Sequence, residues 1–504
     1  MTTDFRYVGR FVRAILVALF AICGCAQNRL TGDMYGDASF VNDYTFTSFT
    51  SACSAAETTG TYLKLTKEWH SLTSQSCAAN LVFRGGRLQP SFGGVLTLSG
   101  SVDAGLGQIF DSSAGGTIKL TGRIVEAYPQ WWGPNLNIGT QVNQAIAALA
   151  PYGGKIVIPN GTYSFSTPIN ADDSRGITIE GSGAPTGGSQ SAVYMIWTAG
   201  GNATAISARS SASFTMRGLQ IIANNPSWSG KWVDLGHSST ESDSFNSHIA
   251  QCGFFAVNGG SASIGMDLSK ATQAYIEHNN ISGKFDVGIR GVENASDYSN
   301  EVVIRENQFS SSTGGSTSSH ILNPGQAWLI EANIFEMGNA AGGRRAIDCN
   351  NAGTATRGVT VSTNWTGDWP SGASGGVLIR ACGTGWAVSG NQLAGPGGGD
   401  VLELADGTNG VAVSGNSFLA APGATSFVFG SGVNNFNAFS NAYSDSTSFM
   451  RGIPASGTIA DARGAITVYG PSAGVSATLV VKGRSGSNCN LAVVNGRIVS
   501  TTCP

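Results

Sequence analysis

The sequence predicts an all-β protein whose body is a right-handed, single-stranded parallel β-helix, and three observations predict it. Of the 504 residues, 70 are glycine and only 12% are charged, which disfavours helices because glycine is a poor helix interior residue. A short unit with an Asn at one fixed place repeats along the second half of the chain. An amphipathic helix precedes the repeats, where the open end of a solenoid needs a cover.

The first 26 residues have the features of an export signal. Three arginines precede an apolar run at residues 14–22, which is about nine residues long, whereas about 20 are needed to cross a bilayer. Residues 22–25 resemble a bacterial lipobox with Cys25 as the lipidated residue, and ordinary cleavage after Ala26 is the alternative. The segment predicts a secreted, periplasmic or outer-surface protein whose only membrane attachment would be a lipid anchor.

Seven cysteines follow Cys25, and an odd number leaves one of them unpaired. One pair brackets an N-terminal segment, one falls at similar places in successive repeats, and one flanks a predicted hairpin with its turn at Asn495 and Gly496. The expected disulfides join Cys53 with Cys77, Cys349 with Cys382, and Cys489 with Cys503. Cys252 is then a buried, unpaired thiol. No Cys-x-x-Cys or Cys/His spacing occurs, which disfavours a zinc site.

A short helix is predicted at residues 141–150. Its apolar stripe at helical spacing comprises Val142, Ala145, Ile146 and Leu149. Thr140 can cap the helix at its start, and the glycines at 153–154 can end it. This helix is expected to cover the first coil of the β-helix, whose strand edges would otherwise be unpaired.

The repeat is marked by an Asn that recurs at intervals of 25 to 31 residues. The column comprises Asn279, Asn307, Asn333, Asn364, Asn391, Asn416 and Asn441, and an earlier copy places Cys252 in it. A short alternating strand precedes each Asn, and a large apolar residue stands two places after it. A second strand follows in the unit, for example at 286–289, 376–379, 400–404 and 426–429.

Stacking these units explains how they bury their apolar faces. Coils spaced about 4.8 Å apart let each strand pair in parallel with the same strand of the next coil. The Asn amides can then hydrogen-bond along the axis as a ladder. The units contain no helical segment and no Leu pattern, which argues against a leucine-rich repeat and a propeller. The β-helix is expected over residues 128–450, with a small β tail at 451–504.

The segment before the repeats carries a family resemblance. Tyr128-Pro-Gln-Trp-Trp-Gly133, the Ala-rich helix and Gly153-Gly-Lys-Ile-Val-Ile-Pro-Asn-Gly-Thr-Tyr163 resemble the start of the β-helix in the pectate lyase superfamily. The similarity is to the branch with rhamnogalacturonase-like and epimerase-like domains, which includes phage tailspike depolymerases. The resemblance implies a lyase, hydrolase or epimerase of acidic polysaccharides. It also implies a β-solenoid-like stem at 27–127, where short strands are expected at 61–65, 80–83, 94–98 and 117–120.

The catalytic signatures of the polygalacturonase branch have no counterpart in this chain. That branch has aspartates on neighbouring coils, a Gly-His-Gly turn and an Arg-x-Lys element. Here the nearest His context is at His237, outside the regular repeats. Asp172 and Asp173 precede the regular coils and are expected to form a turn.

Candidate catalytic residues therefore come from the charges between residues 277 and 348. Alternation places Glu277, Arg305 and Glu331 outward in one column, with His278 beside them. A lyase needs a cation for the sugar carboxylate, for which Arg305 or Arg345 are candidates, and a base, for which Lys284 or His278 are candidates. A hydrolase needs two carboxylates, and the candidates are Glu331 with Glu336 or Asp348. The alternative interpretation of the column is a cross-strand salt-bridge ladder.

Tryptophans are the candidates for stacking on sugar rings. Trp365 and Trp369 fall in the longest turn, with Asp368 between them, and are expected to bind substrate. Trp328 and Trp386 point inward by alternation and are expected in the core.

The sequence thus predicts an exported protein that acts on polysaccharide as a lyase or hydrolase of an acidic glycan. A non-catalytic surface polysaccharide-binding protein or adhesin is the alternative, favoured by the missing signatures. The net charge of −3 argues against a nucleic-acid partner. No cofactor or metal is expected, since no Asp-x-Asp loop supports a calcium site. The oligomeric state stays open, a trimer included.

Overall fold

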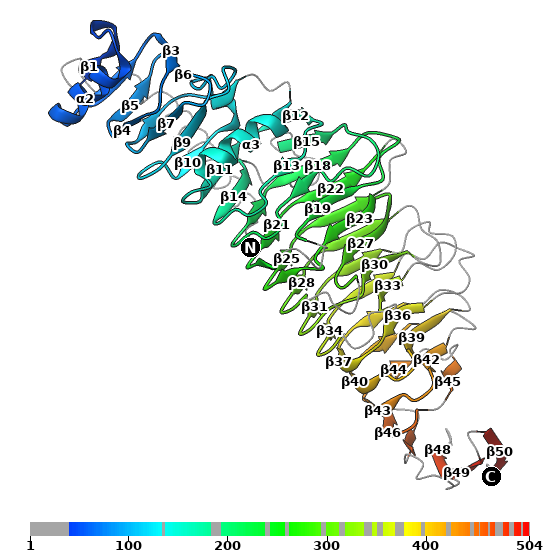
Figure 1. Ribbon diagram of the computed structural model, residues 1–504. Helices are drawn as coiled ribbons and strands as arrows, with labels where there is room; N and C mark the ends of the chain where they lie inside the picture. Colours follow the sequence, from blue (N-terminus) through cyan, green and yellow to red (C-terminus); the bar gives the residue numbers. More distant parts are fainter. Residues whose placement is uncertain are drawn as a thin grey trace, which may run out of the picture.

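The computed structural model describes most of the chain beyond residue 39 as one elongated solenoid (Figure 1). The described residues are 40–133, 137–182, 193–236, 242–257, 262–293, 299–311, 318–336, 345–349, 356–367, 377–394, 399–419, 425–443, 448–452, 454–461, 464–468, 477–482, 488–494 and 497–502. The predicted export signal at residues 1–26, with Cys25, lies outside them. In the described part, no helix is both long and apolar enough to span a membrane.

Three long sheets run along the solenoid, and their strands pair in parallel from coil to coil. Sheet I comprises β10 (Glu126–Ala127), β11 (Gly154–Ile158), β14 (Ile177–Gly181), β17 (Thr215–Arg217), β21 (His248–Ala250), β25 (Tyr275–Glu277), β28 (Val303–Arg305), β31 (Leu329–Glu331), β34 (Thr360–Ser362), β37 (Thr384–Ser389), β40 (Asn409–Ser414), β43 (Asn434–Phe439), β46 (Gly457–Asp461) and the antiparallel β47 (Gly464–Val468).

Sheet II comprises β12 (Gly161–Phe165), β15 (Val193–Trp197), β18 (Leu219–Ala223), β22 (Gly253–Ala256), β26 (Asn280–Gly283), β29 (Gln308–Ser311), β32 (Ile334–Glu336), β35 (Trp365–Gly367), β38 (Gln392–Leu393), β41 (Ser417–Phe418) and β44 (Ala442–Tyr443). Sheet III comprises β13 (Ile169–Asn170), β16 (Ile206–Ser207), β19 (Lys231–Asp234), β23 (Ala262–Asp267), β27 (Phe285–Arg290), β30 (Ser319–Leu322), β33 (Arg345–Asp348), β36 (Val377–Ala381), β39 (Asp400–Leu404), β42 (Thr425–Phe429) and β45 (Ser448–Arg451).

Each coil therefore contributes one strand to each of three sheets, which is the predicted right-handed parallel β-helix. The sequence predicted only two strands per coil, and this was wrong. The missing strand is the short one of sheet II that directly follows the Asn, such as β32. Its two to five residues are too few for a visible alternation. A pair of short strands, β20 (Ser244–Phe245) and β24 (Ala271–Thr272), adds to the turn that leads back into sheet I.

The corner between sheets I and II is built by two residues of each coil. The residue before the Asn adopts a left-handed conformation, for example His278 with φ 54° and Ala332 with φ 53°. Such a conformation costs about 1–2 kcal/mol for a residue with a Cβ, so the corner needs a compensating interaction. The next residue supplies it, because each Asn side chain bonds to the coils on either side.

The predicted Asn ladder is continuous along the axis. The Nδ2 of Asn333 donates to Oδ1 of Asn364 at 3.0 Å and to the carbonyl of Ile304 at 2.9 Å. Its Oδ1 accepts from both nitrogens of Asn307. The same pattern links all seven Asn from Asn279 to Asn441, and each is at most 2% exposed.

Cys252 occupies the first position of the ladder, as predicted. Its backbone N–H donates to Oδ1 of Asn279 at 2.9 Å, while its thiol lies in the core. Burial raises the pKa of this thiol to about 12. Cys252 is therefore an inert core side chain.

Helix α3 (Ile138–Leu149) covers the first coil and packs against β9 (Thr117–Leu120), β11, β12 and β13. Val142, Ala145, Ile146 and Leu149 are its buried stripe, as predicted. The predicted start was wrong: the helix begins three residues earlier, so Thr140 lies inside it. The N-cap is Asn137, whose side chain instead donates to Thr167 at 3.0 Å and ties the helix to the loop after β12.

The stem before α3 is also built from parallel strands. They are β1 (Phe40–Asn42), β2 (Tyr62–Leu65), β3 (Glu68–Leu72), β4 (Gln75–Cys77), β5 (Asn80–Phe83), β6 (Arg87–Pro90), β7 (Val95–Leu98), β8 (Val102–Asp103) and β9 (Thr117–Leu120). Helix α2 (Phe49–Thr59) packs against β1, β2 and β4, and the short 3-10 turns are η2 (Asp43–Thr45) and η3 (Pro129–Trp132).

The tail contains β48 (Ala477–Lys482), β49 (Asn488–Val494) and β50 (Arg497–Thr502), which pair antiparallel. The predicted hairpin is thus the β49–β50 pair. Its turn and Cys503 lie outside the described residues, and the expected pairing of Cys489 with Cys503 stays a prediction.

Two of the expected disulfides are present: Cys53 with Cys77, and Cys349 with Cys382. The second closes a loop with a sequence separation of 33 and ties neighbouring coils at the ends of β33 and β36. Replacing both cysteines by alanine is expected to lower the free energy of unfolding by about 3–4 kcal/mol, because the unfolded chain gains freedom. Urea unfolding monitored by circular dichroism measures the loss, and an unchanged midpoint would contradict it.

Candidate functional site

The outer face of sheet I carries a column of alternating charges. The register aligns Glu180, Arg217, Ala250, Glu277, Arg305 and Glu331 on successive strands. Nε of Arg305 lies 2.8 Å from Glu277, and Arg217 lies 3.1 Å from Glu180. Surface pairs of this kind contribute about 0–1 kcal/mol each. The part of the column before Glu277 was not recognised from the sequence, because those coils lack the marker Asn.

Two histidines belong to the same face. His248, which sequence reasoning missed, lies 3.2 Å from Glu277 and packs edge-on against the exposed Tyr275. His278 lies 2.8 Å from Glu306 at the corner toward sheet II. Apart from Glu331, the charges named on this face are therefore paired with one another.

The candidate residues from the sequence lie on three different faces. Glu331 is on sheet I, Glu336 on sheet II and Asp348 on sheet III. The structure thus brings Glu277 together with Arg305, and Arg345 together with Asp348, but separates the carboxylates considered for a hydrolase. Lys284 follows β26 at the corner between sheets II and III.

Of the tryptophans, Trp328 and Trp386 are core residues, 1% and 2% exposed. Trp365 is the first residue of β35 and points outward from sheet II, so it lies in a strand and not in the long turn expected from the sequence. Trp369 and Asp368 lie outside the described residues.

Sheet III carries two fully buried carboxylates. Asp348 is fully buried between Arg345, at 2.5 Å, and Arg380, at 3.7 Å. Further toward the N-terminal end, Asp267 is fully buried between Lys231, at 2.7 Å, and Arg290, at 2.6 Å. Each buried acid therefore has two cationic partners, as a buried charge requires.

A cavity of about 390 Å³ opens over the first three strands of sheet III. Its polar lining comprises Asn170, Asp172, Ser207, Arg209, Lys231 and Asp234, among others. Asp172 stands in the turn expected from the sequence, in which Asp173 has φ 57°. Sequence reasoning missed the cavity, because nothing in the turn residues shows that the next two strands bring Arg209 and Lys231 beside it.

The two carboxylates of the cavity flank one serine. Oγ of Ser207 donates to Asp172 at 2.5 Å, and Ser207 pairs with Asp234 on the neighbouring strand. The carboxylates are therefore one to two strand spacings apart, about 5–10 Å. Retaining and inverting glycosidases both separate their carboxyl groups by distances in this range.

Cations orient both carboxylates. Asp172 accepts from the backbone and the guanidinium of Arg209, at 2.8 and 3.2 Å. Lys231 donates to Asp234 at 3.1 Å. The cavity thus presents two acids and two cations side by side, and each cation is paired with an acid.

No protein-family model matches this chain, and no curated protein matches it. Its fold is similar to that of the alginate lyase from Paenibacillus sp. str. FPU-7, at 13% identity and a TM-score of 0.39, over 65% of this chain and 97% of that chain. It is also similar to the DFA-IIIase from Arthrobacter chlorophenolicus A6, at 14% identity and a TM-score of 0.44, over 69% and 87%. A third similar structure is the tailspike protein of E. coli bacteriophage HK620 in complex with pentasaccharide, at 12% identity and a TM-score of 0.41, over 65% of this chain and 62% of that chain. The β-helix itself rests on the strand register of this chain.

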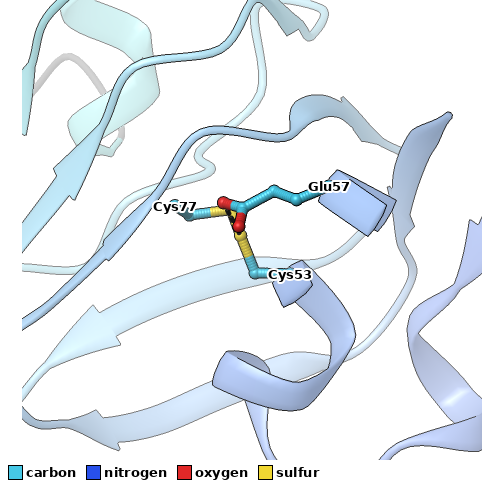
Figure 2. A group of neighbouring side chains, drawn as sticks. All are labelled: Cys53, Glu57 and Cys77. Carbon is cyan, nitrogen blue, oxygen red and sulfur yellow. Dashed lines mark hydrogen bonds between the residues drawn. A yellow bond between two sulfur atoms is a disulfide. The ribbon is translucent and has the colours of Figure 1, made fainter. Parts of the chain in front are cut away.

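One group of cysteines and a carboxylate gathers in the stem: Cys53, Glu57 and Cys77 (Figure 2). The two sulfurs are joined in the disulfide and carry no thiolate for a metal. Glu57 accepts from the backbone N–H of Ala78 at 2.5 Å. The group is therefore a cross-link between α2 and β4.

The buried cluster around Asp267 gives a prediction for acid stability. Burial alone would raise the pKa of Asp267, but the adjacent Arg290 and Lys231 outweigh it and hold the pKa below 3.8. The pKa of Asp267 is lower in the folded protein than in the unfolded chain. The ionised cluster therefore stabilises the fold fully above about pH 3.8, and this contribution is lost as the pH falls through the pKa of the folded state.

We expect the Asp267→Asn variant to have a lower melting temperature than the wild type at neutral pH. The difference between the two melting temperatures should become smaller in acid. Melting temperatures of both proteins, measured in steps from about pH 7 to about pH 2, test this. A difference that stays constant over that range would show that the charge of Asp267 contributes nothing.

Proposed function

We propose that this protein is an exported enzyme that binds an acidic polysaccharide in the sheet III cavity and hydrolyses it. The observation that carries the proposal is the pair of carboxylates, Asp172 and Asp234, beside two cations in one cavity. Export is supported by the sequence of residues 1–26 and by two disulfides, which persist in oxidising compartments.

The lining favours hydrolysis over elimination. A lyase needs a base for the proton next to the sugar carboxylate, and among the residues that the structure describes the cavity lining contains neither His nor Tyr. Lys231 donates to two carboxylates and so serves as a cation. Two carboxylates supply what hydrolysis needs: an acid for the glycosidic oxygen, and a nucleophile or base for the anomeric carbon or its attacking water.

Each cavity residue has a role in this proposal. Arg209 and Lys231 face the sugar carboxylate, and their pairing with Asp172 and Asp234 fixes the two acids in place. Ser207 orients Asp172 through its hydroxyl. Arg345, which is paired with the buried Asp348, continues the same face along the axis and can contact further sugars of the chain, while Arg305 belongs to the ladder on sheet I.

A non-catalytic binding protein is the second candidate. It is favoured by one observation: both cations of the cavity are already paired with carboxylates, as in a structural ion network. Binding without cleavage would follow if the acids serve only to hold the cations.

The experiment that separates these functions incubates the chain from residue 27 onward with a panel of uronate polysaccharides. New reducing ends and the absorbance of unsaturated products are recorded together. The proposal predicts reducing ends without unsaturated products. Unsaturated products would indicate a lyase, and retention of a polysaccharide without any cleavage would indicate the binding protein.

A further inference from the structure

A tryptophan lies along the outer face of sheet II. The indole of Trp365 covers Gly367, where an added Cβ would come within 2.3 Å of the ring. A side chain at residue 367 would therefore displace the indole. Trp365 is partly exposed, so part of its side chain lies against the strand and part is accessible to solvent.

A second aromatic ring has the same arrangement four strands away. Phe255 covers Gly253, where an added Cβ would come within 2.5 Å of its ring, and it is also partly exposed. The strands between them are β26, β29 and β32. Four strand spacings of about 4.8 Å put the two rings about 19 Å apart along the axis.

Between the rings, the outward side chains other than Ile334 are hydrogen-bonding groups. Asn280, Gln308 and Ile334 form one register column, and Ser282, Ser310 and Glu336 form the other. The Gln308 amide donates to Glu336 at 2.8 Å. Gln392 continues the first column beyond Trp365. Among the described residues, this strip contains a single carboxylate and no cation.

We propose that this strip, from Phe255 to Gln392 on sheet II, binds an uncharged polysaccharide chain laid along the solenoid axis. Partly exposed aromatic rings can stack on the apolar face of a sugar ring. Amides and hydroxyls at each coil can donate hydrogen bonds to the hydroxyl groups of the sugar and accept hydrogen bonds from them. The strip lacks the cations that an acidic glycan would need, and a protein partner would need a larger apolar core than two rings and Ile334 provide.

This binding goes beyond the proposed hydrolysis and does not depend on it, since the strip and the cavity lie on different sheets. A surface that holds a neutral glycan on the same solenoid as a hydrolytic cavity would keep the enzyme attached to a mixed polysaccharide matrix.

The test is affinity gel electrophoresis of the whole chain through gels containing a soluble neutral polysaccharide, with a galactomannan, a mixed-linkage β-glucan and a dextran as probes. At least one probe is expected to retard the wild type. Trp365→Ala is expected to bind it roughly tenfold or more weakly, because the stacking face is lost. Gly367→Val keeps the indole but fills the space over residue 367 in which the indole packs. This substitution is expected to weaken binding as well.

Phe92→Ala serves as the matched control, since Phe92 is an 89% exposed aromatic residue of the stem. Its retardation should equal that of the wild type. Retardation of the Trp365 and Gly367 variants to the wild-type extent, with unchanged circular dichroism, would overturn the proposal. So would the absence of retardation by all three probes. If sedimentation showed that Trp365→Ala dissociates an oligomer instead, the occupant of the strip would be a second copy of the chain, and the proposal would equally be wrong.

Discussion

Replacing either carboxylate of the cavity, by Asp172→Asn or Asp234→Asn, is expected to lower kcat for glycan hydrolysis by about 100- to 10,000-fold. The reason is that an amide can neither donate a carboxyl proton nor act as nucleophile or base, and each such role is worth about this much. Reducing-end assays at saturating substrate measure the effect. KM is expected to change less, because Arg209 and Lys231 remain to hold the substrate.

Asp173→Asn is the matched control for this pair. It stands next to Asp172 in the same turn at φ 57°, and asparagine tolerates this conformation. Its kcat should match the wild type. If Asp172→Asn and Asp234→Asn are both as active as Asp173→Asn, the cavity is not the catalytic site.

The second large effect is expected in the Asn ladder. Asn333→Ala removes one acceptor and one donor group from the core. The backbone N–H of Asn307 then loses its hydrogen bond to Oδ1 of residue 333. The carbonyl of Ile304 and Oδ1 of Asn364 lose their hydrogen bonds from Nδ2. Each buried group without a partner costs about 1–3 kcal/mol. The free energy of unfolding is therefore expected to fall by about 3–5 kcal/mol, as measured by urea denaturation.

Asn437→Ala provides the comparison, since Asn437 points outward from β43 and is exposed. This variant is expected to change the stability by less than about 0.5 kcal/mol. Equal effects of the two substitutions would mean that the ladder does not stabilise the coils.

Most of the fold could be predicted because its signal repeats. The Asn of each coil must be buried next to a left-handed residue, so the same pair recurs at a fixed place, as at Ala332 and Asn333. The sheet II strands were missed because only two to five residues of each coil belong to them. Cys252 could be placed in the ladder because its neighbours align with the later coils, although its side chain makes none of the amide contacts.

The site was harder to predict for a physical reason. Alternation tells which residues of one strand point outward, so Glu277, Arg305 and Glu331 could be aligned on one face. It does not tell on which of three faces a carboxylate lies after a corner, so Glu336 and Asp348 could not be separated from Glu331. The cavity brings Asp172 and Lys231 together from different coils. These coils lack the marker Asn, and no local sequence pattern predicts the cavity.

In the proposed function, the sheet III cavity holds the glycan during cleavage. The most direct measurement is a crystal structure of Asp234→Asn with an oligosaccharide that the wild type cleaves. We expect a sugar ring in the cavity, with its carboxylate at Arg209 and Lys231 and its glycosidic oxygen between Asp172 and residue 234. An oligosaccharide bound elsewhere on the solenoid, with the cavity empty, would contradict it.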